Sequence, residues 1–332
     1  MTDAPSGLVL VTGATGYIGS RLVPALLDAG WAVRVLTRSA AGVADRGWAS
    51  RVEVAQGDAA DPAVLAEACA GVQVAYYLLH SMDGRPDFER RDRRMALGFA
   101  RAAREAGVGR IVYLSGLHPE GVRLSSHLES RTEVAEILLA SGVPTTVLQA
   151  AVILGSGSAS FEMLRHLTRR LPAMVAPKWL TNRIQPIAVR DVLTYLVASA
   201  QMPSQVSRTF DIGGPDVLTY KQMIGRFAQI DGLRARPIMT VPVLTPWLAS
   251  HWVGVVTPVP ASIAKPLVGS LIHEVVCKEH DIAGLVPDPP GGLLGFDEAV
   301  RAALAGEEST RPEPGTVDPA WLTSADPDWA GS

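Results

Sequence analysis

The chain has 332 residues, with 30 Lys and Arg against 33 Asp and Glu and a formal net charge of −3 at pH 7. This balance gives no electrostatic reason for a nucleic-acid partner. The length suits one main domain with a smaller lobe, or one enlarged α/β domain. The N-terminus lacks the pattern of a signal peptide. Cys69 and Cys277 are far apart and in no metal-ligand spacing, so we expect a cytoplasmic protein without a metal site.

Short apolar, β-branched runs alternate with segments of helical periodicity over residues 1–150. The expected strands cover residues 8–11, 32–36, 52–56, 72–79, 110–114 and 145–149. The expected helices cover residues 17–27, 62–70, 88–106 and 127–140. This alternation predicts an α/β fold, a doubly wound parallel sheet of the Rossmann type.

The pattern becomes less regular after residue 150. Helices are expected at 161–170, 189–200, 220–230 and 296–305, and short strands at 208–212 and 237–241. We therefore expect residues 151–306 to form a smaller, irregular substrate lobe interleaved with the core. Residues 307–332 are rich in Pro, Asp, Gly and Ser, a composition that predicts a disordered tail.

Residues 237–264 contain no Asp, Glu, Lys or Arg. Five prolines divide this segment into pieces too short to cross a membrane, so we expect no membrane span. A wall of an apolar pocket is the simpler interpretation, and peripheral membrane contact is the alternative.

Three glycines at three-residue spacing, Gly13, Gly16 and Gly19, connect the first strand to the first helix. In a Rossmann turn the first glycine permits the bend, the second lets the backbone approach a diphosphate, and the third allows close packing. The unpaired amides of the helix N-terminus attract the anion. The sequence thus predicts a dinucleotide-binding turn made by Gly13, Thr15, Gly16, Tyr17, Ile18 and Gly19.

The end of the second strand indicates which dinucleotide is bound. An acidic residue there favours NAD, whereas a basic residue accommodates the additional phosphate of NADP. Here Thr37, Arg38 and Ser39 include no acidic side chain, and the Arg38 guanidinium can form a charge-assisted fork with a 2′-phosphate. We predict NADP(H) as the preferred cofactor, with NAD(H) as the alternative.

Two further strand ends are expected to contact the cofactor. Asp58 and Ala59 follow the third strand, where the Asp58 carboxylate would accept from the adenine amino group or cap the next helix. Leu78, Leu79 and His80 follow the fourth strand, at the carboxyl edge where ligands collect in such sheets.

Together these motifs resemble those of the atypical and extended short-chain dehydrogenase/reductases, in particular the YbjT-like and NmrA-like NAD(P)-binding proteins. The segments that carry the resemblance are residues 12–19, 76–82, 126–128, 155–162, 183–187, 257–260 and 296–300. The likeness runs from about residue 8 to residue 305. It implies a Rossmann-type fold and NAD(P)-dependent oxidoreductase chemistry.

The resemblance also implies a catalytic serine, which Ser115 matches, and a Tyr-x-x-x-Lys pair, which this chain lacks. His127 and Arg131 stand in that position, on one face of a helix. Arginine can hydrogen-bond ribose hydroxyls, and histidine carries protons near neutrality. The charge of Arg131 and the helix N-terminus should lower the pKa of His127.

Alternative interpretations remain for both histidines. Ser126 and Glu129 form a capping-box pattern, so His127 would then be only the first residue of a capped helix. His80 is either a second proton donor or a hydrogen-bonded structural histidine.

The leading hypothesis is an NAD(P)H-binding, atypical short-chain oxidoreductase, acting as a monomer or homodimer on a small-molecule substrate. It would transfer hydride from NADPH to a small or apolar carbonyl- or quinone-like acceptor. The alternative is a non-catalytic NAD(P)-binding sensor or assembly protein of the NmrA-like type. The absent Tyr-Lys pair favours the alternative, whereas Ser115 and His80 favour the enzyme.

Overall fold

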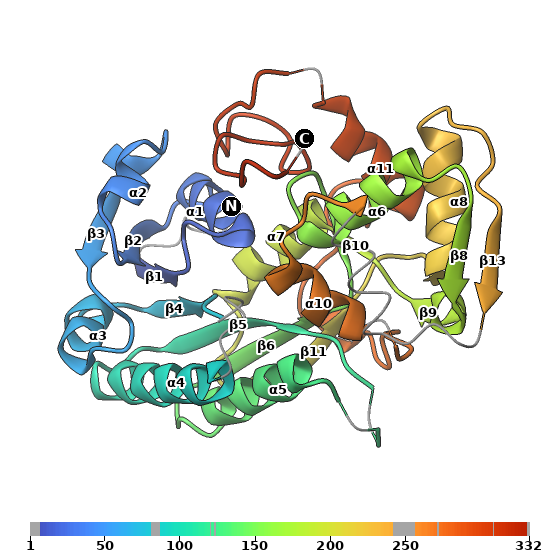
Figure 1. The fold of residues 1–332 in the computed structure, drawn as a ribbon. Helices are drawn as coiled ribbons and strands as arrows, with labels where there is room; N and C mark the ends of the chain where they lie inside the picture. Colours follow the sequence, from blue (N-terminus) through green and yellow to red (C-terminus); the bar gives the residue numbers. More distant parts are fainter. Residues whose placement is uncertain are drawn as a thin grey trace.

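A parallel seven-stranded sheet forms the centre of the structure, a computed structural model that describes residues 7–80, 87–119, 121–122, 124–241, 256–270, 272–307 and 309–330. The strand order is β11-β6-β5-β4-β1-β2-β3 (Figure 1). The strands are β1 (Leu8–Thr12), β2 (Ala32–Thr37), β3 (Val52–Gln56), β4 (Val74–Tyr77), β5 (Arg110–Gly116), β6 (Thr145–Ala150) and β11 (Arg208–Ile212). From β1 the sheet grows towards β3, and from β4 it grows the other way towards β11, so the strand order switches between β1 and β4. This order confirms the predicted Rossmann-type fold.

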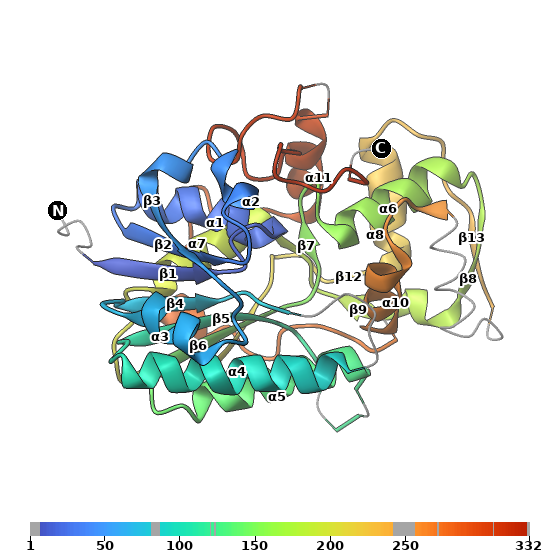
Figure 2. The same cartoon turned by 60° about the vertical axis from the view of Figure 1, so that its left-hand side comes forward.

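Helices cover both faces of this sheet (Figure 2). One layer contains α1 (Tyr17–Asp28), α2 (Ala41–Ala44) and α7 (Val189–Ser199), and the other contains α3 (Pro62–Cys69), α4 (Phe88–Glu105) and α5 (Ser126–Leu139). Successive residues of a strand point to opposite faces. Accordingly Val11 packs in the core beneath α1, whereas its neighbour Leu10 packs with Phe99 in the core beneath α4.

The remaining elements lie beyond one end of the sheet (Figure 2). The helices there are α6 (Ala159–Arg170), α8 (Tyr220–Ile230), α10 (Ala261–Ser270) and α11 (Phe296–Ala305). Short strands pair between them: β7 (Ile153–Leu154) with β10 (Ile187–Ala188), β9 (Arg183–Ile184) with β12 (Leu218–Thr219), and β8 (Met174–Pro177) with β13 (Ile238–Val241). Of these strands only β13 was expected, because runs of two to four residues are too short to show a period.

The helices expected from periodicity are present, with ends within two residues of the predicted ones. The clearest correction concerns α5. Its N-cap is Ser125, whose Oγ accepts from the Leu128 amide at 3.4 Å, and not Ser126. His127 is therefore the second residue of the helix.

The C-terminal segment differs from the expected disordered tail. Residues 309–330 form a coil that packs beside α1, with Ala320, Thr323, Asp326 and Ala330 buried (Figure 1). The physical reason is an ion pair between the Asp326 carboxylate and the buried Arg21 guanidinium at 2.7 Å. Composition could not reveal this pairing, because the two residues lie far apart in the chain.

Among the described residues, no helix combines the length and the apolar character needed to cross a membrane. Of the apolar segment 237–264, residues 242–255 lie outside the described part of the chain. Both cysteines are free thiols. Burial raises the pKa of Cys69 to about 11, and burial together with the nearby Asp211 carboxylate raises the pKa of Cys277 to about 12.

A buried threonine joins the two strands at the centre of the sheet. Thr12 Oγ1 donates to the Tyr76 carbonyl at 2.9 Å and accepts from the Leu78 amide at 3.1 Å. Thr12 is fully buried, so neither backbone group can turn to water instead. The contact fixes the end of β1 against the end of β4.

Replacing Thr12 by Val should therefore lower the free energy of unfolding by about 1–3 kcal/mol, because the isosteric side chain leaves both backbone groups unpaired. Urea unfolding measures the change. Thr12→Ser keeps the hydroxyl and is the matched control, expected to lose less. Equal stabilities for the two variants would show that the hydrogen bonds contribute little.

Candidate functional site

A pocket of about 280 Å³ opens at the carboxyl ends of β1, β4, β5 and β6. The glycine turn and the strand ends form one side, and residues of α6, α8 and α10 form the other. The predicted site residues that line it are Gly13, Gly16, Tyr17, Ile18, Gly19, Leu78, Leu79, His80, Ser115, His127 and Arg131. Those that do not line it are Thr15, Thr37, Arg38, Ser39, Asp58 and Ala59.

The glycine turn has the geometry that an anion needs. Gly13 has a φ of +70°, and a Cβ there would lie 2.7 Å from the Leu78 carbonyl oxygen. At Gly19 a Cβ would overlap the Gly13 carbonyl oxygen and lie 2.7 Å from the Ala14 Cα. Gly16 caps α1 without a side-chain hydrogen bond, and the first turn holds no acidic residue. The first amides of α1 are thus open to a diphosphate, which fits a dinucleotide.

The residues expected to contact the adenosine follow the neighbouring strands, outside the pocket. Thr37 Oγ1 accepts from the Ser39 amide at 3.3 Å and donates to the Ser39 carbonyl at 3.1 Å. Arg38 is exposed and forms no ion pair within the described part of the chain. Its guanidinium is therefore available to an anionic ligand at the end of β2.

The structure separates the two roles considered for Asp58. Its carboxylate accepts from the Ala60 amide at 2.9 Å, whereas the N-cap of α3 is Asp61, which accepts from the Ala63 amide at 2.9 Å. The expected capping role thus belongs to Asp61. Contact between Asp58 and adenine stays a prediction, as does contact with the neighbouring Ala59.

His127 and Arg131 are joined on the face of α5 that meets the pocket. Arg131 Nε donates to His127 Nε2 at 3.1 Å. An imidazole that accepts at Nε2 and is neutral carries its proton on Nδ1, so this contact assigns the tautomer. The structure thus brings together the two residues that the sequence predicts in place of the family's Tyr-Lys pair.

The imidazole of His127 is held neutral. Desolvation first, then the charge of Arg131, lowers its pKa to about 3. The direction agrees with the expectation, but the larger cause is burial rather than the neighbouring charge. The pKa of His80 is lowered as well, by desolvation and by Arg131. His80 lines the same pocket, and its side chain is partly open to solvent.

Ser115 presents a buried hydroxyl to the pocket. The residue is 3% exposed, and its Oγ has no hydrogen-bond partner among the described residues. A buried hydroxyl without a partner is costly, so it is expected to bind a ligand or a water molecule. Ser115 comes from the end of β5, next to the pair on α5.

Sequence reasoning missed Tyr220, the first residue of α8. It is 4% exposed, lines the pocket, and makes no hydrogen bond with the described residues. The capping box of Thr219 and Gln222 marks the start of this helix in the sequence, but nothing local shows that it faces the pocket. Apolar side chains surround the same side, namely Met163 of α6 and Ile263 and Leu267 of α10.

The sheet order and the glycine turn define a protein with a Rossmann-type α/β fold. The sequence profile of the NmrA-like family matches residues 5–231, and the chain belongs to that family.

The chain is 31% identical over 205 residues to a ceramide reductase of Caulobacter vibrioides, with 61% of this chain and 63% of that protein covered. It thus spans less than two thirds of that relative. It is 30% identical over 233 residues to a (4-alkanoyl-5-oxo-2,5-dihydrofuran-3-yl)methyl phosphate reductase of Streptomyces griseus, with 68% and 74% covered.

A solved structure shares the fold. It is that of an NADPH-dependent quinone oxidoreductase of Escherichia coli complexed with NADPH, at a TM-score of 0.70 and 18% identity. The similarity covers 88% of this chain and 98% of the other.

The lowered pKa of His127 predicts a stability that falls in acid. The pKa is ordinarily 6.5, and about 3 in the folded chain, so between these values the unfolded chain binds the proton more readily. The free energy of unfolding therefore decreases as the pH falls from about 6.5 towards 3. Its slope against pH corresponds to the uptake of at most about one proton on unfolding. His127→Gln should remove this contribution in urea unfolding measured from pH 4 to pH 7.

Arg131→Gln is the companion variant, because it removes the charge but leaves His127 desolvated. For this variant, the slope of the free energy of unfolding against pH should lie between the slopes of the wild type and His127→Gln. Identical pH slopes for the wild type and His127→Gln would contradict the assignment of a neutral, desolvated imidazole.

Proposed function

We propose that the protein is an NADPH-dependent reductase of apolar carbonyl- or quinone-type acceptors. The observation that carries the proposal is one continuous pocket that joins the glycine turn of α1 to Ser115 and His127. A cofactor anchored at that turn and an acceptor beside those two side chains would share a single cavity.

The relatives support reduction as the reaction class. The two relatives described above are both reductases, one of a ceramide and one of a (4-alkanoyl-5-oxo-2,5-dihydrofuran-3-yl)methyl phosphate. The fold also accommodates NADPH, as the quinone oxidoreductase shows. Function depends on the site rather than on the fold, so the acceptor class rests on the pocket itself.

Cofactor binding would use three groups of this chain. The amides of Tyr17 and Ile18 would bind the diphosphate, because the Gly16 amide already donates to the Gly13 carbonyl at 3.0 Å. Arg38 would bind the 2′-phosphate of the adenosine ribose. Arg131 would hydrogen-bond ribose hydroxyls, as the family's lysine does. When bound, NADPH supplies the hydride that reduces the acceptor.

Ser115 and His127 would act on the acceptor oxygen. The hydroxyl of Ser115 and the Nδ1–H of His127 are hydrogen-bond donors of two residues that line the same pocket. Donors aimed at a developing oxyanion stabilise the transition state without a full proton transfer. A neutral imidazole is a weak acid, so this arrangement suits electrophilic acceptors such as quinones better than unactivated ketones.

The apolar wall would hold the body of the acceptor. Met163, Ile263 and Leu267 line this side, and Tyr220, Ser160 and Ser270 add hydroxyls. Arg131 is the only residue with a permanent charge among the described residues that line the pocket. We infer that the acceptor is uncharged and largely apolar, and that the elements after residue 150 form its binding lobe.

A non-catalytic NAD(P)-binding sensor is the second candidate function. The observation that favours it is the hydrogen bond from Arg131 to His127, which replaces the Tyr-Lys pair and leaves a weak acid. Tight NADPH binding without turnover of any quinone, aldehyde or enone would support this alternative.

Cofactor selectivity tests the role of Arg38. Arg38→Ala should raise the Kd for NADPH about tenfold, because the charge-assisted hydrogen bonds to the phosphate are lost, while the Kd for NADH changes little. Calorimetric titration with both nucleotides measures this. Arg46→Ala, which removes another arginine close to β2, is the control. An unchanged preference would exclude Arg38 as the selecting residue.

Turnover tests the donors on the acceptor oxygen. Ser115→Ala and His127→Gln should each lower kcat about 10- to 100-fold with a quinone acceptor, while the Kd for NADPH stays near the wild-type value. NADPH oxidation at 340 nm follows the reaction. Ser126→Ala alters an exposed serine on the same helix and should leave kcat unchanged. Full activity in both variants would exclude these roles.

A further inference from the structure

Arg21 is a buried cation in the second turn of α1, the helix that begins at the glycine turn. Its side chain is 1% exposed and that of Asp326 is 0% exposed. Arg21 Nη1 donates to Asp326 Oδ1 and Nη2 donates to Oδ2, each at 2.7 Å. This is a two-pronged pairing, in which a planar guanidinium and a carboxylate fix each other's orientation.

The same guanidinium holds the C-terminal segment 309–330, which we call the strap. Arg21 Nε donates to the Pro319 carbonyl at 2.8 Å, and Nη2 donates to the Trp321 carbonyl at 2.9 Å. Asp326 in turn accepts from the amide and hydroxyl of Thr323, at 2.8 and 2.9 Å. Both partners of the ion pair therefore make further hydrogen bonds with residues of the strap.

The strap also binds the turn before α6, residues 155–158. Arg21 Nη2 donates to the Ser156 carbonyl at 3.2 Å, and the Ser156 amide donates to the Ala320 carbonyl at 2.8 Å. Gly157, with a φ of +91°, lies so close to Asp326 that a Cβ would be 2.5 Å from the carboxyl carbon. Asp326 is thus packed between α1 and this turn.

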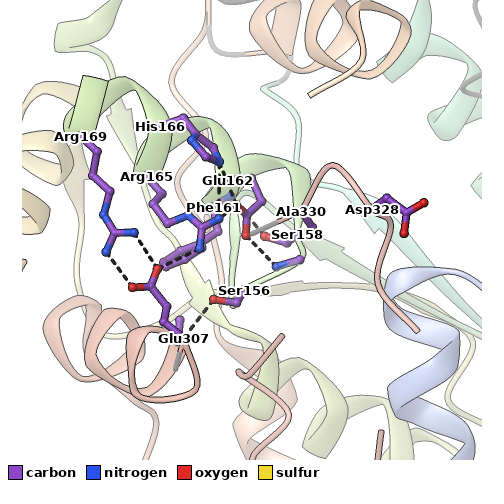
Figure 3. Close-up of polar contacts among 12 residues, drawn as sticks. Ser156, Ser158, Phe161, Glu162, Arg165, His166, Arg169, Glu307, Asp328 and Ala330 are labelled. Carbon is purple, nitrogen blue, oxygen red and sulfur yellow. Dashed lines mark hydrogen bonds and ion pairs between the residues drawn. The ribbon is translucent and has the colours of Figure 1, made fainter. Parts of the chain in front are cut away.

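Glu162 holds the other side of the turn. Its Oε1 accepts from the Gly157 amide at 2.9 Å, and its carboxylate pairs with Arg165 at 2.5 Å. Arg165 Nη1 continues the network to Glu307 at 2.9 Å, just before the strap begins (Figure 3). With Glu162 on one side and Asp326 on the other, the turn has little freedom to move.

Both elements held by the strap are walls of the pocket. Arg21 Cζ lies 4.0 Å from the centroid of the Tyr17 ring, and Nη1 donates to the Tyr17 carbonyl at 3.2 Å. Tyr17 lines the pocket beside Gly16, and Ser158, the N-cap of α6, lines it at the end of the turn. The strap therefore connects the cofactor side of the pocket to its acceptor side from outside.

We propose that Asp326 is a positioning residue, which through Arg21 fixes Tyr17 and the 155–158 turn in the geometry that binds NADPH. The inference rests on the proposed function, because it takes NADPH as the ligand of the pocket. Loss of the carboxylate leaves the Arg21 charge buried without its partner, so that the side chain shifts towards water and releases the Tyr17 ring. Because coupling between two sites is reciprocal, NADPH binding must in turn stabilise the strap.

Asp326→Asn in the full chain tests this inference, with Asp328→Asn as the matched control. Asp328 belongs to the same strap but is fully exposed and points away from the network (Figure 3). We expect Asp326→Asn to raise the Kd for NADPH about fivefold, equivalent to about 1 kcal/mol, and Asp328→Asn to leave it unchanged. Thr323→Ala, which removes one hydrogen bond to the carboxylate, should act in the same direction with a smaller increase, and it serves if Asp326→Asn fails to fold.

Hydrogen exchange supplies a measurement that a purely structural role would not affect. NADPH should slow amide exchange in peptides covering 309–330 and 155–158 in the wild type, and should do so less in Asp326→Asn. NADPH binding that leaves strap exchange unchanged would overturn the inference. So would a tighter Kd in Asp326→Asn, which is what the unneutralised Arg21 charge alone would cause by attracting phosphate.

The two proposals fail in different ways. A wild-type protein that binds no NADPH overturns the proposed function and this inference with it. A wild-type protein that binds NADPH, together with an Asp326→Asn variant of the same affinity, overturns the role of Asp326 alone.

Discussion

The close packing of the glycine turn against the end of β4 is the constraint on which the pocket depends. Gly13 lies so near the Leu78 carbonyl that no side chain fits, and Thr12 fastens the same strand end by two hydrogen bonds. As a result α1 begins where the strand order switches between β1 and β4. The anion site at the N-terminus of α1 then lies at the carboxyl edge of the sheet, where ligands bind in such folds.

Charge is divided between the two sides of this pocket. Arg131 lies on the sheet side with Ser115 and His127, whereas α6 and α10 contribute uncharged side chains, both apolar residues and the hydroxyls of Ser160 and Ser270. A low local dielectric strengthens hydrogen bonds and disfavours a charged imidazole. Burial, together with the charge of Arg131, accordingly lowers the pKa of His127.

Local patterns predicted much of this molecule, because strands, helices and the glycine turn are encoded by neighbouring residues. The alternation over residues 1–150 was sufficient for the sheet, and four-residue spacing was sufficient to place His127 beside Arg131. Contacts between distant segments were not accessible. Tyr220 follows β12, whose pairing with β9 positions the start of α8. Asp326 is buried with its charge paired to Arg21, a residue far away in the sequence.

The state of the two thiols bears on the acceptors this protein could tolerate. Quinones and enones alkylate cysteine through its thiolate, the nucleophilic form. Burial raises the pKa of Cys69 to about 11 and that of Cys277 to about 12, so both remain protonated at neutral pH. At neutral pH the two thiols would therefore react only slowly with electrophiles that attack thiolates.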